Sequence, residues 1–264
     1  MADRRVGWFP SLLAILVFLF LLAPLLVIFL ASFSPTALVV FPPRGFSLEW
    51  YANVFSSPAN FLNGFKNSLL VAVIATAVDL VLGVAAALCI GRYRFRGRSA
   101  LLLFFTSPMY IPSVAFAFVL LQTFSAMGSV PAFLKILLGH TVVILPYIIR
   151  NTLSMLAVFD WTLEDAAASL GARPRDVFFR VTLPVIKPGV IAGALLSFLY
   201  SFDEVVLAGL LNSPRFVTLP VRIMNYIELS FDPTLAAISA LLILFSFTAI
   251  LLLERLTGLD MFVH

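Results

Sequence analysis

Three acidic residues lie inside apolar segments that are long enough to cross a lipid bilayer. Asp79 lies in one such segment, and Asp203 and Glu204 are adjacent in another. A charged side chain at the centre of a bilayer costs about 2.5–3.5 kcal/mol, so it usually faces a water-filled cavity or a polar partner. These carboxylates can attract a cation along an aqueous path or make polar contacts between helices, and for Asp79 both interpretations stay open. Because successive helix residues point about 100° apart, Asp203 and Glu204 are not expected to face the same ligand, and we favour Asp203 for the path.

Two tyrosines join these acids as candidate residues of a solute path. Tyr110 lies between Pro108 and Pro112, and prolines four residues apart remove backbone hydrogen bonds and kink a helix. A kinked helix within a membrane is tolerated where it is buried or lines a cavity, and a tyrosine ring there can bind an amine by cation–π contact. A kink that serves packing alone is the alternative. Tyr147, which is close to Arg150 in another apolar segment, can line the same path.

The rare residue types exclude several kinds of catalytic site. The 264 residues include one cysteine, Cys89, and two histidines, His140 and His264. A single cysteine forms no intrachain disulfide, and no cluster of cysteines or histidines is available for a metal. An intramembrane enzyme would need convergent serine and histidine, paired acids or metal ligands, which a lone His140 does not supply. We therefore expect no enzyme and no metal site, and we expect Cys89 and His140 to be packing residues.

Composition is that of an integral membrane protein. Apolar residues make up 62% of the chain and charged residues 11%, and the mean hydropathy is +1.09. A soluble domain carries about a quarter charged residues, whereas apolar runs of about twenty residues span a bilayer as helices. We predict a single all-α transmembrane domain over residues 1–264. Its six transmembrane helices are expected at residues 10–32, 66–90, 100–125, 131–156, 188–211 and 234–254.

The distribution of lysine and arginine predicts how these helices are oriented. Residues 92–98 include four arginines, and the loop 157–187 is also basic, whereas residues 126–130 have no basic side chain. Cytoplasmic loops carry the excess of basic residues, so we expect these two basic loops and both termini in the cytoplasm. The net charge of +4 then reflects cytoplasmic loops, and no nucleic-acid partner is expected.

Two segments on the outer side are longer than simple turns. In residues 33–65, Ser47 and Glu49 form a pattern that favours the start of a short helix. Trp50, which follows directly, is typical of the boundary between membrane and water. Residues 212–233 contain three prolines, so we predict an outer loop there.

The cytoplasmic loop 157–187 carries the most informative pattern. Strong helix formers run from Glu164 to Ser169, ahead of Gly171, which can end a helix. The second half begins near Pro174, which suits the first turn of a helix. We therefore predict two short helices joined by a glycine corner. A solvated connector has no need of apolar side chains such as Phe178, Phe179 and Leu183, so the loop is expected to be a docking surface.

A family resemblance rests on this loop. The pattern Asp165-Ala166-Ala167, Gly171 and Val181-x-Leu183-Pro184 resembles the EAA loop of binding-protein-dependent ABC importer permeases, although the family usually has glutamate where this chain has Asp165. The resemblance extends over nearly the whole chain and is most similar to the spermidine/putrescine branch, in particular its second permease subunit. Other residues that carry it are Trp50-Tyr51, Asn67-Ser68-Leu69, the 92–98 loop, Ser107-Pro108 and the segment 201–206.

The resemblance implies a type I ABC importer permease fold with a cytoplasmic coupling loop, which in the family sits in a cleft of the ATPase and couples ATP hydrolysis to helix motion. The implied partners are a homologous second permease, two cytoplasmic ATPase subunits, a periplasmic or extracellular substrate-binding protein and membrane lipid. The implied location is the bacterial inner membrane. This chain lacks the Gly-x-x-x-x-Gly-Lys-Ser/Thr motif, so it is expected to hold no cofactor, and ATP with Mg²⁺ is expected on the ATPases. The coupling residues implied are Glu164, Asp165, Ala166, Ala167, Gly171, Leu183 and Pro184.

The resemblance also implies a substrate class, with one departure. The expected function is import of a small amine, a polyamine such as spermidine or putrescine, by alternating access. Polyamine permeases often carry an acid directly after the Ser-Pro pair, where this chain has Met109. Another small solute, such as γ-aminobutyrate or an aminophosphonate, is therefore the alternative. A secondary transporter is a second alternative. It would need an inverted repeat with broken helices at matching positions, and we find neither in the sequence.

Overall fold

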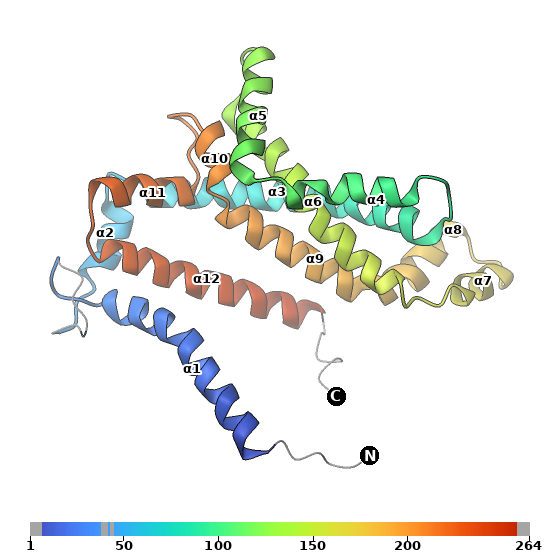
Figure 1. The fold of residues 1–264 in the computed structure, drawn as a ribbon, viewed down its shortest axis with the longest axis horizontal. Coiled ribbons are helices and arrows are strands. Elements are labelled where there is room, and N and C mark those ends of the chain that lie inside the picture. The colour runs from blue at the N-terminus through green and yellow to red at the C-terminus, as the bar shows by residue number, and fades with distance from the viewer. Residues whose placement is uncertain (1–6, 38–41, 43–44, 258–264) are drawn as a thin grey trace. The chain divides into compact units, whose positions relative to one another are not determined.

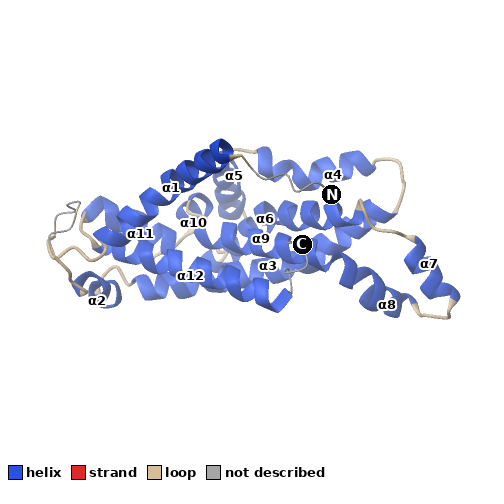
Figure 2. Cartoon of the chain, turned by 90° about the horizontal axis from the view of Figure 1, so that it is seen from below, coloured by secondary structure: helices blue, strands red, loops and turns tan. Residues whose placement is uncertain are grey.

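Helices make up nearly all of the described part of the chain, residues 7–37, 42 and 45–257 of a computed structural model (Figure 1). No strand occurs among these residues (Figure 2), which confirms the all-α prediction. The α-helices are α1 Trp8–Ala31, α2 Glu49–Ser56, α3 Phe61–Arg92, α4 Arg98–Thr106, α5 Ser113–Ala126, α6 Ala132–Leu156, α7 Thr162–Ser169, α8 Pro174–Val177, α9 Leu183–Asp203, α10 Val206–Leu211, α11 Leu219–Leu229 and α12 Thr234–Thr257. A 3₁₀ turn, η1 Ser107–Tyr110, and a π-helical turn, η2 Phe178–Thr182, complete the set.

Candidate membrane spans agree with the prediction of about six. Five helical runs are long and apolar enough to cross a bilayer. A sixth candidate is formed by α4 with η1 and α5, which are bent by 101° at their break. The five runs are Trp8–Ala31, Phe61–Arg92, Ala132–Leu156, Pro174–Asp203 and Thr234–Leu252.

The third predicted span, residues 100–125, is not one continuous helix. The α-helical backbone stops at Thr106, continues as the 3₁₀ turn η1, and is extended at Ile111 with ψ of 130°. Pro112 follows Ile111 and accounts for this, because the residue before a proline is disfavoured in helical conformation. The expected kink is therefore a complete break, with a change of direction of 101°.

Two other predictions of helix limits were wrong. The fifth span, predicted at residues 188–211, ends at Asp203 and resumes as α10 at Val206. The segment 212–233, predicted as a loop, contains α11. Pro220 lies in the first turn of α11, where a proline has no hydrogen bond to lose, so it starts a helix rather than excluding one.

The chain divides into two compact units, and the first comprises residues 1–62 and 223–247. Within it, the indole N–H of Trp50 donates to the carbonyl of Ser34 at 2.7 Å, and the Asn53 amide donates to the Thr234 hydroxyl at 2.8 Å. The short helix starts at Glu49, whose backbone N–H donates to the hydroxyl of Ser47 at 3.1 Å, but its capping residue is Leu48 and not Ser47. These bonds attach α2 to the segment after α1 and to the start of α12.

The second unit comprises residues 63–222 and 248–264, and close packing of α6 on α9 lies at its centre. A methyl group on Gly189 would lie 2.5 Å from the carbonyl oxygen of Asn151, and one on Gly193 would lie 2.8 Å from the Cα of Ile148. One helical turn further along α9, the Ser197 hydroxyl donates to the Ile144 carbonyl at 3.1 Å. Small residues four apart let two helix backbones approach closely, as is common between membrane helices.

This packing predicts that Gly189→Ala destabilises the protein. Its Cβ would meet backbone atoms of α6 that cannot move aside cheaply, and overpacking of this kind costs about 1–3 kcal/mol. The matched control is Gly209→Ala in α10, where the nearest atom, on Val221, would be 4.0 Å from the new Cβ. The midpoint of thermal unfolding in detergent should fall for Gly189→Ala alone, and equal midpoints would contradict this account of the α6–α9 contact.

Candidate functional site

The loop 157–187 has the predicted glycine corner. Helix α7 ends at Ser169, Gly171 has a φ of +86°, and Pro174 begins the next helix. A positive φ is readily adopted by glycine, so Gly171 is the residue that lets the chain turn there. The second short helix is not separate, however, because residues 174–203 form one helical run through α8, η2 and α9. The loop therefore leads directly into a membrane span.

The start of α7 is defined by Asp160. Its carboxylate accepts hydrogen bonds from the hydroxyl of Thr162 at 2.7 Å and from the backbone N–H of Thr162 at 3.0 Å. These two bonds lower the pKa of the exposed Asp160 side chain, because they stabilise its charged form. Asp160 thus supplies an acceptor for a backbone group that the helix itself leaves without a partner.

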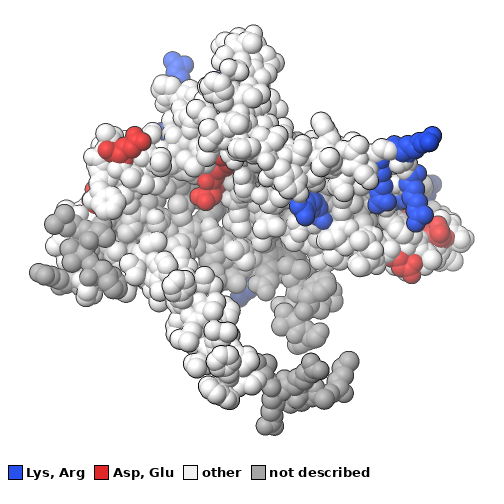
Figure 3. Space-filling model, viewed as in Figure 1, with Lys and Arg blue, Asp and Glu red and all other residues white. Residues whose placement is uncertain are grey.

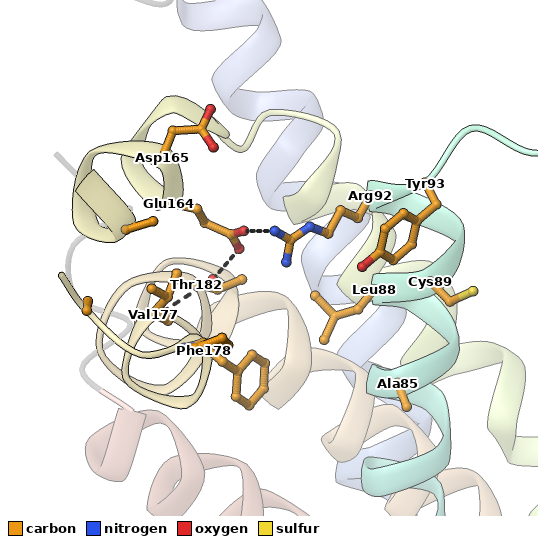
Figure 4. Close-up of a pocket in the computed structure, with 13 residues that line it drawn as sticks. Ala85, Leu88, Cys89, Arg92, Tyr93, Glu164, Asp165, Val177, Phe178 and Thr182 are labelled. Atoms are coloured by element: carbon orange, nitrogen blue, oxygen red, sulfur yellow. Dashed lines mark hydrogen bonds and ion pairs between the residues drawn. The ribbon is translucent and has the colours of Figure 1, made fainter. Parts of the chain in front are cut away.

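Glu164 and Asp165, the two adjacent acids of the loop, have different surroundings. The Glu164 side chain is 5% exposed and its Oε2 lies 2.7 Å from an Arg92 guanidinium nitrogen. The hydroxyl of Thr182 donates to the other oxygen, Oε1. Asp165 is exposed, and the ion pair drawn from Arg92 runs to Glu164 and not to Asp165 (Figure 4). Only Asp165 of the pair is therefore available to another subunit.

A pocket of about 420 Å³ separates the end of α3 from the loop. Leu88 and Cys89 line it from α3, and Val177 and Phe178 line it from the loop (Figure 4). The exposed Cys89 thus borders a cavity, contrary to the expectation that it is a packing residue.

Exposure of apolar side chains on the loop differs from the prediction. Phe179 is 62% exposed, as expected, but Phe178 lines the pocket and Leu183 packs against a buried cluster. The most exposed apolar residue of the loop is Leu170, at 90%, which directly precedes the glycine corner and which sequence reasoning missed. Of the other residues expected to couple, Ala166, Gly171 and Pro184 are exposed and Ala167 is half-buried.

Asp203 and Glu204, the two adjacent acids of the membrane region, lie at the break between α9 and α10. Asp203 is the last residue of α9 and is exposed. The buried Glu204 carboxylate accepts the backbone N–H groups of Val206, Leu207 and Ala208, at 3.0, 3.0 and 3.1 Å. Backbone N–H groups at a helix start have no intrahelical partner, and a negative charge there is favourable. The oxygens of Glu204 are thus hydrogen-bonded to backbone groups of this chain, whereas the side chain of Asp203 is exposed.

His140 belongs to the same break, which sequence reasoning missed. It is buried in α6, its Nδ1 lies 2.8 Å from the Ser201 hydroxyl, and its Nε2 lies 3.7 Å from the Glu204 carboxylate. The sequence shows a histidine, a serine and an acid within apolar segments, but no known spacing pattern predicts that these three side chains meet. The His140 ring therefore makes polar contacts with residues at a helix break, whereas we expected it only to fill space between helices.

The remaining candidates for a solute path differ in their access to solvent. Tyr110 is 69% exposed and shares a shallow pocket of about 380 Å³ with Arg150. The half-buried Tyr147 ring lies 5.3 Å from the ring of Tyr200, centroid to centroid. Asp79 is fully buried, and neither of its carboxylate oxygens has a hydrogen-bond partner within the described part of the chain. Asp79 and Glu204 are therefore buried, whereas Tyr110 and Asp203 are exposed.

Comparisons with known proteins all identify transport permeases as similar to this chain. The family model described as "Binding-protein-dependent transport system inner membrane component" matches residues 79–258. The chain is 33% identical over 233 residues to the putrescine transport system permease protein PotI of Escherichia coli, covering 86% of this chain and 82% of that protein. It is 30% identical over 214 residues to the spermidine/putrescine transport system permease protein PotC of Haemophilus influenzae, covering 81% and 83%.

A solved structure has the same fold. It is described as a bacterial ABC transporter involved in the import of the acidic polysaccharide alginate. Superposition gives a TM-score of 0.71 over 95% of this chain and 94% of that chain, at 16% sequence identity. At this low sequence identity, the similarity is evidence for the fold alone.

The break between α9 and α10 predicts different effects for the two acids there. Glu204→Ala leaves three backbone N–H groups without an acceptor, and each unsatisfied buried group costs about 1–3 kcal/mol. Asp203→Asn changes an exposed side chain at the adjacent position. The unfolding midpoint in detergent should fall for Glu204→Ala and stay unchanged for Asp203→Asn. An equal fall for both variants would show that Glu204 does not hold the start of α10.

Proposed function

The chain belongs to the family of binding-protein-dependent transport system inner membrane components, and we propose that it moves a polyamine, putrescine or spermidine, across the bacterial inner membrane. As a member of this family it is a multi-pass membrane permease, and it works with a partner permease, an ATPase and a substrate-binding protein. We take one homologous second permease and two ATPases as the stoichiometry, and we take residues 1–264 as a single permease domain. ATP and Mg²⁺ belong to the ATPases.

The substrate class is carried by one observation, the similarity to relatives named as putrescine and spermidine/putrescine permeases. The exposed carboxylate of Asp203 at the end of α9 supports it, because a carboxylate within a membrane segment attracts a cation. Glu204 is excluded as a free ligand because its oxygens accept three backbone N–H groups. Tyr110 and Tyr147 add aromatic faces that suit an amine, and Asp79 would join the path only after a conformational change.

Coupling to ATP hydrolysis is proposed to occur through the loop 157–187. Its exposed groups include an acid, Asp165, and a large apolar side chain, Leu170. Exposed apolar side chains beside a charged group form the kind of surface that a partner protein covers. The ATPase is expected to bind this surface, with Gly171 setting the angle between its two halves.

Helix α9 offers a physical route from the loop to the solute path. The helical run 174–203 begins in the loop and ends at Asp203. Thirty helical residues span about 45 Å, the thickness of a whole membrane. A displacement of the loop by the ATPase would therefore move α9, and Asp203 at its far end, relative to the partner permease. Alternating access follows if this motion opens the path to one side at a time.

Orientation follows from charge. Lysine and arginine side chains gather around the loop between α3 and α4 (Figure 3), as expected for a cytoplasmic surface. This loop and the coupling loop are joined by the Arg92–Glu164 ion pair, which supports placing both on one side of the membrane. Both termini are accordingly proposed to be cytoplasmic.

The substrate assignment predicts which solutes stimulate ATP hydrolysis by the complete, reconstituted complex with its binding protein. Putrescine or spermidine should stimulate, and Asp203→Asn should reduce the stimulation without loss of assembly. Removing one charge contact of this kind corresponds to about tenfold in affinity for the cation. The control is Glu228→Gln, which neutralises an exposed acid on α11. If only γ-aminobutyrate or an aminophosphonate stimulates, the permease assignment stands and the polyamine is wrong.

The docking surface predicts the effect of a single charge on the loop. Leu170→Asp should abolish co-purification of the ATPase, because the introduced carboxylate would have to be desolvated in the contact. Leu229→Asp, which changes a residue of α11 that is 85% exposed, is the matched control and should retain the ATPase. Unfolding midpoints measured on the isolated permease should be equal for both variants. Retention of the ATPase by Leu170→Asp would exclude Leu170 from the contact.

A further inference from the structure

One buried carboxylate joins three segments of the chain at the cytoplasmic loop. Glu164 belongs to α7, Arg92 is the last residue of α3, and Thr182 is the last residue of η2, directly before α9. Arg92 lies 2.7 Å from one Glu164 oxygen, and the Thr182 hydroxyl donates to the other. Each carboxylate oxygen therefore bonds to a different element, and Glu164 links the loop to two helices at once.

The position of Arg92 is set by aromatic neighbours as well as by Glu164. Its guanidinium carbon lies 5.8 Å from the ring centroid of Tyr93 and 5.8 Å from that of Trp161. A guanidinium over an aromatic face is attracted by the ring. Trp161 directly precedes α7, so Arg92 contacts the loop at two points. This geometry depends on the planar, forked shape of arginine.

The contact lies beside a cavity and next to a small apolar cluster, which also joins α3, the loop and α9 through Ala87, Phe159 and Ile186. Arg92 and Glu164 both line the pocket of about 420 Å³, and the Arg92 side chain is 48% exposed while that of Glu164 is 5% exposed (Figure 4). A tightly packed core transmits motion through its side-chain contacts. Here a polar bridge beside a cavity adds to the apolar contacts of Ala87, Phe159 and Ile186, and its charges can be exchanged without changing that cluster.

The π-helical turn next to this contact is a second, independent observation. Residues 178–182 have π-helical hydrogen bonding between α8 and α9. A single π turn inside an α-helix is frequently found at a functional site. Thr182 ends this turn and bonds to Glu164, so the loop is attached at the point where the long helix departs from regular geometry.

We propose that Arg92, Glu164 and Thr182 form a coupling clamp that makes α3 and α9 follow the loop as one body. The clamp rests on the proposed function, in which the ATPase displaces this loop, and its members are positioning residues that touch neither ATP nor solute. Because the Arg92 side chain is 48% exposed, this ion pair adds little stability, and it is better explained by the specific arrangement that it enforces. The exposed Asp165 contacts the ATPase, and the buried Glu164 passes the displacement on.

Charge exchange in the complete reconstituted complex tests the clamp. Arg92→Glu and Glu164→Arg should each keep the ATPase bound and hydrolysing, while solute moved per ATP falls by at least about fivefold, the lower range of measured couplings between sites. The double variant Arg92→Glu/Glu164→Arg should recover most of the loss. Thr182→Val should lower the same ratio, and Thr182→Ser should retain it. Arg94→Glu, an equal charge reversal two residues from Arg92, is the control and should leave the ratio unchanged.

A second readout separates failure of the clamp from failure of the substrate assignment. Cys89 is the only cysteine of the chain and lines the pocket. Its rate of maleimide labelling should rise in Arg92→Glu and return toward the wild-type rate in the double variant, whichever solute the complex carries. If wild type transports no polyamine but labelling follows this pattern, the substrate is wrong and the clamp stands. An unchanged ratio and unchanged labelling in both single variants, or no recovery in the double variant, would overturn the clamp.

Discussion

Backbone hydrogen bonding within the membrane constrains every interruption of a helix in this protein. In hydrocarbon a free N–H or C=O group has no water to bond, so a break is tolerated only where something else supplies the partner. At the break between α9 and α10 the partner is Glu204, whose carboxylate accepts three backbone N–H groups. At the break before α5 the residue that resumes the chain, Pro112, has no N–H to satisfy. Glu204 thus supplies acceptors for three N–H groups at one break, whereas Pro112 removes a single donor at the other.

The same constraint makes α9 suitable for carrying motion. Its helical run begins in the cytoplasmic loop, packs closely on α6 through Gly189 and Gly193, and ends where Glu204 holds the next helix. Close backbone packing resists bending, so displacement at one end reaches the other. In the proposed mechanism, the docking residue Leu170, the clamp at Glu164 and the exposed carboxylate of Asp203 lie along one route for this motion.

Adjacent acids divide their roles twice in the structure. Glu164 and Glu204 are buried and bonded to groups of the fold, whereas Asp165 and Asp203 are exposed. Within α7, helix geometry turns the Glu164 and Asp165 side chains about 100° apart. In the second pair Asp203 ends α9 and Glu204 follows it with extended backbone, so the end of the helix separates the two side chains. The buried member positions a helix, and the exposed member is left for a partner subunit or a solute.

Local sequence properties determined the class of the protein, the approximate spans, the glycine corner at Gly171 and the family, because apolar run length and turn residues act over a few positions. They did not determine where α9 ends, that α11 exists, or which acid of each pair is buried. Those features depend on contacts between residues distant in the chain, such as His140 with Ser201, 61 positions apart, and Arg92 with Glu164. Only the folded chain brings such groups together, since burial and hydrogen-bond partners are properties of the packed structure and not of the local pattern.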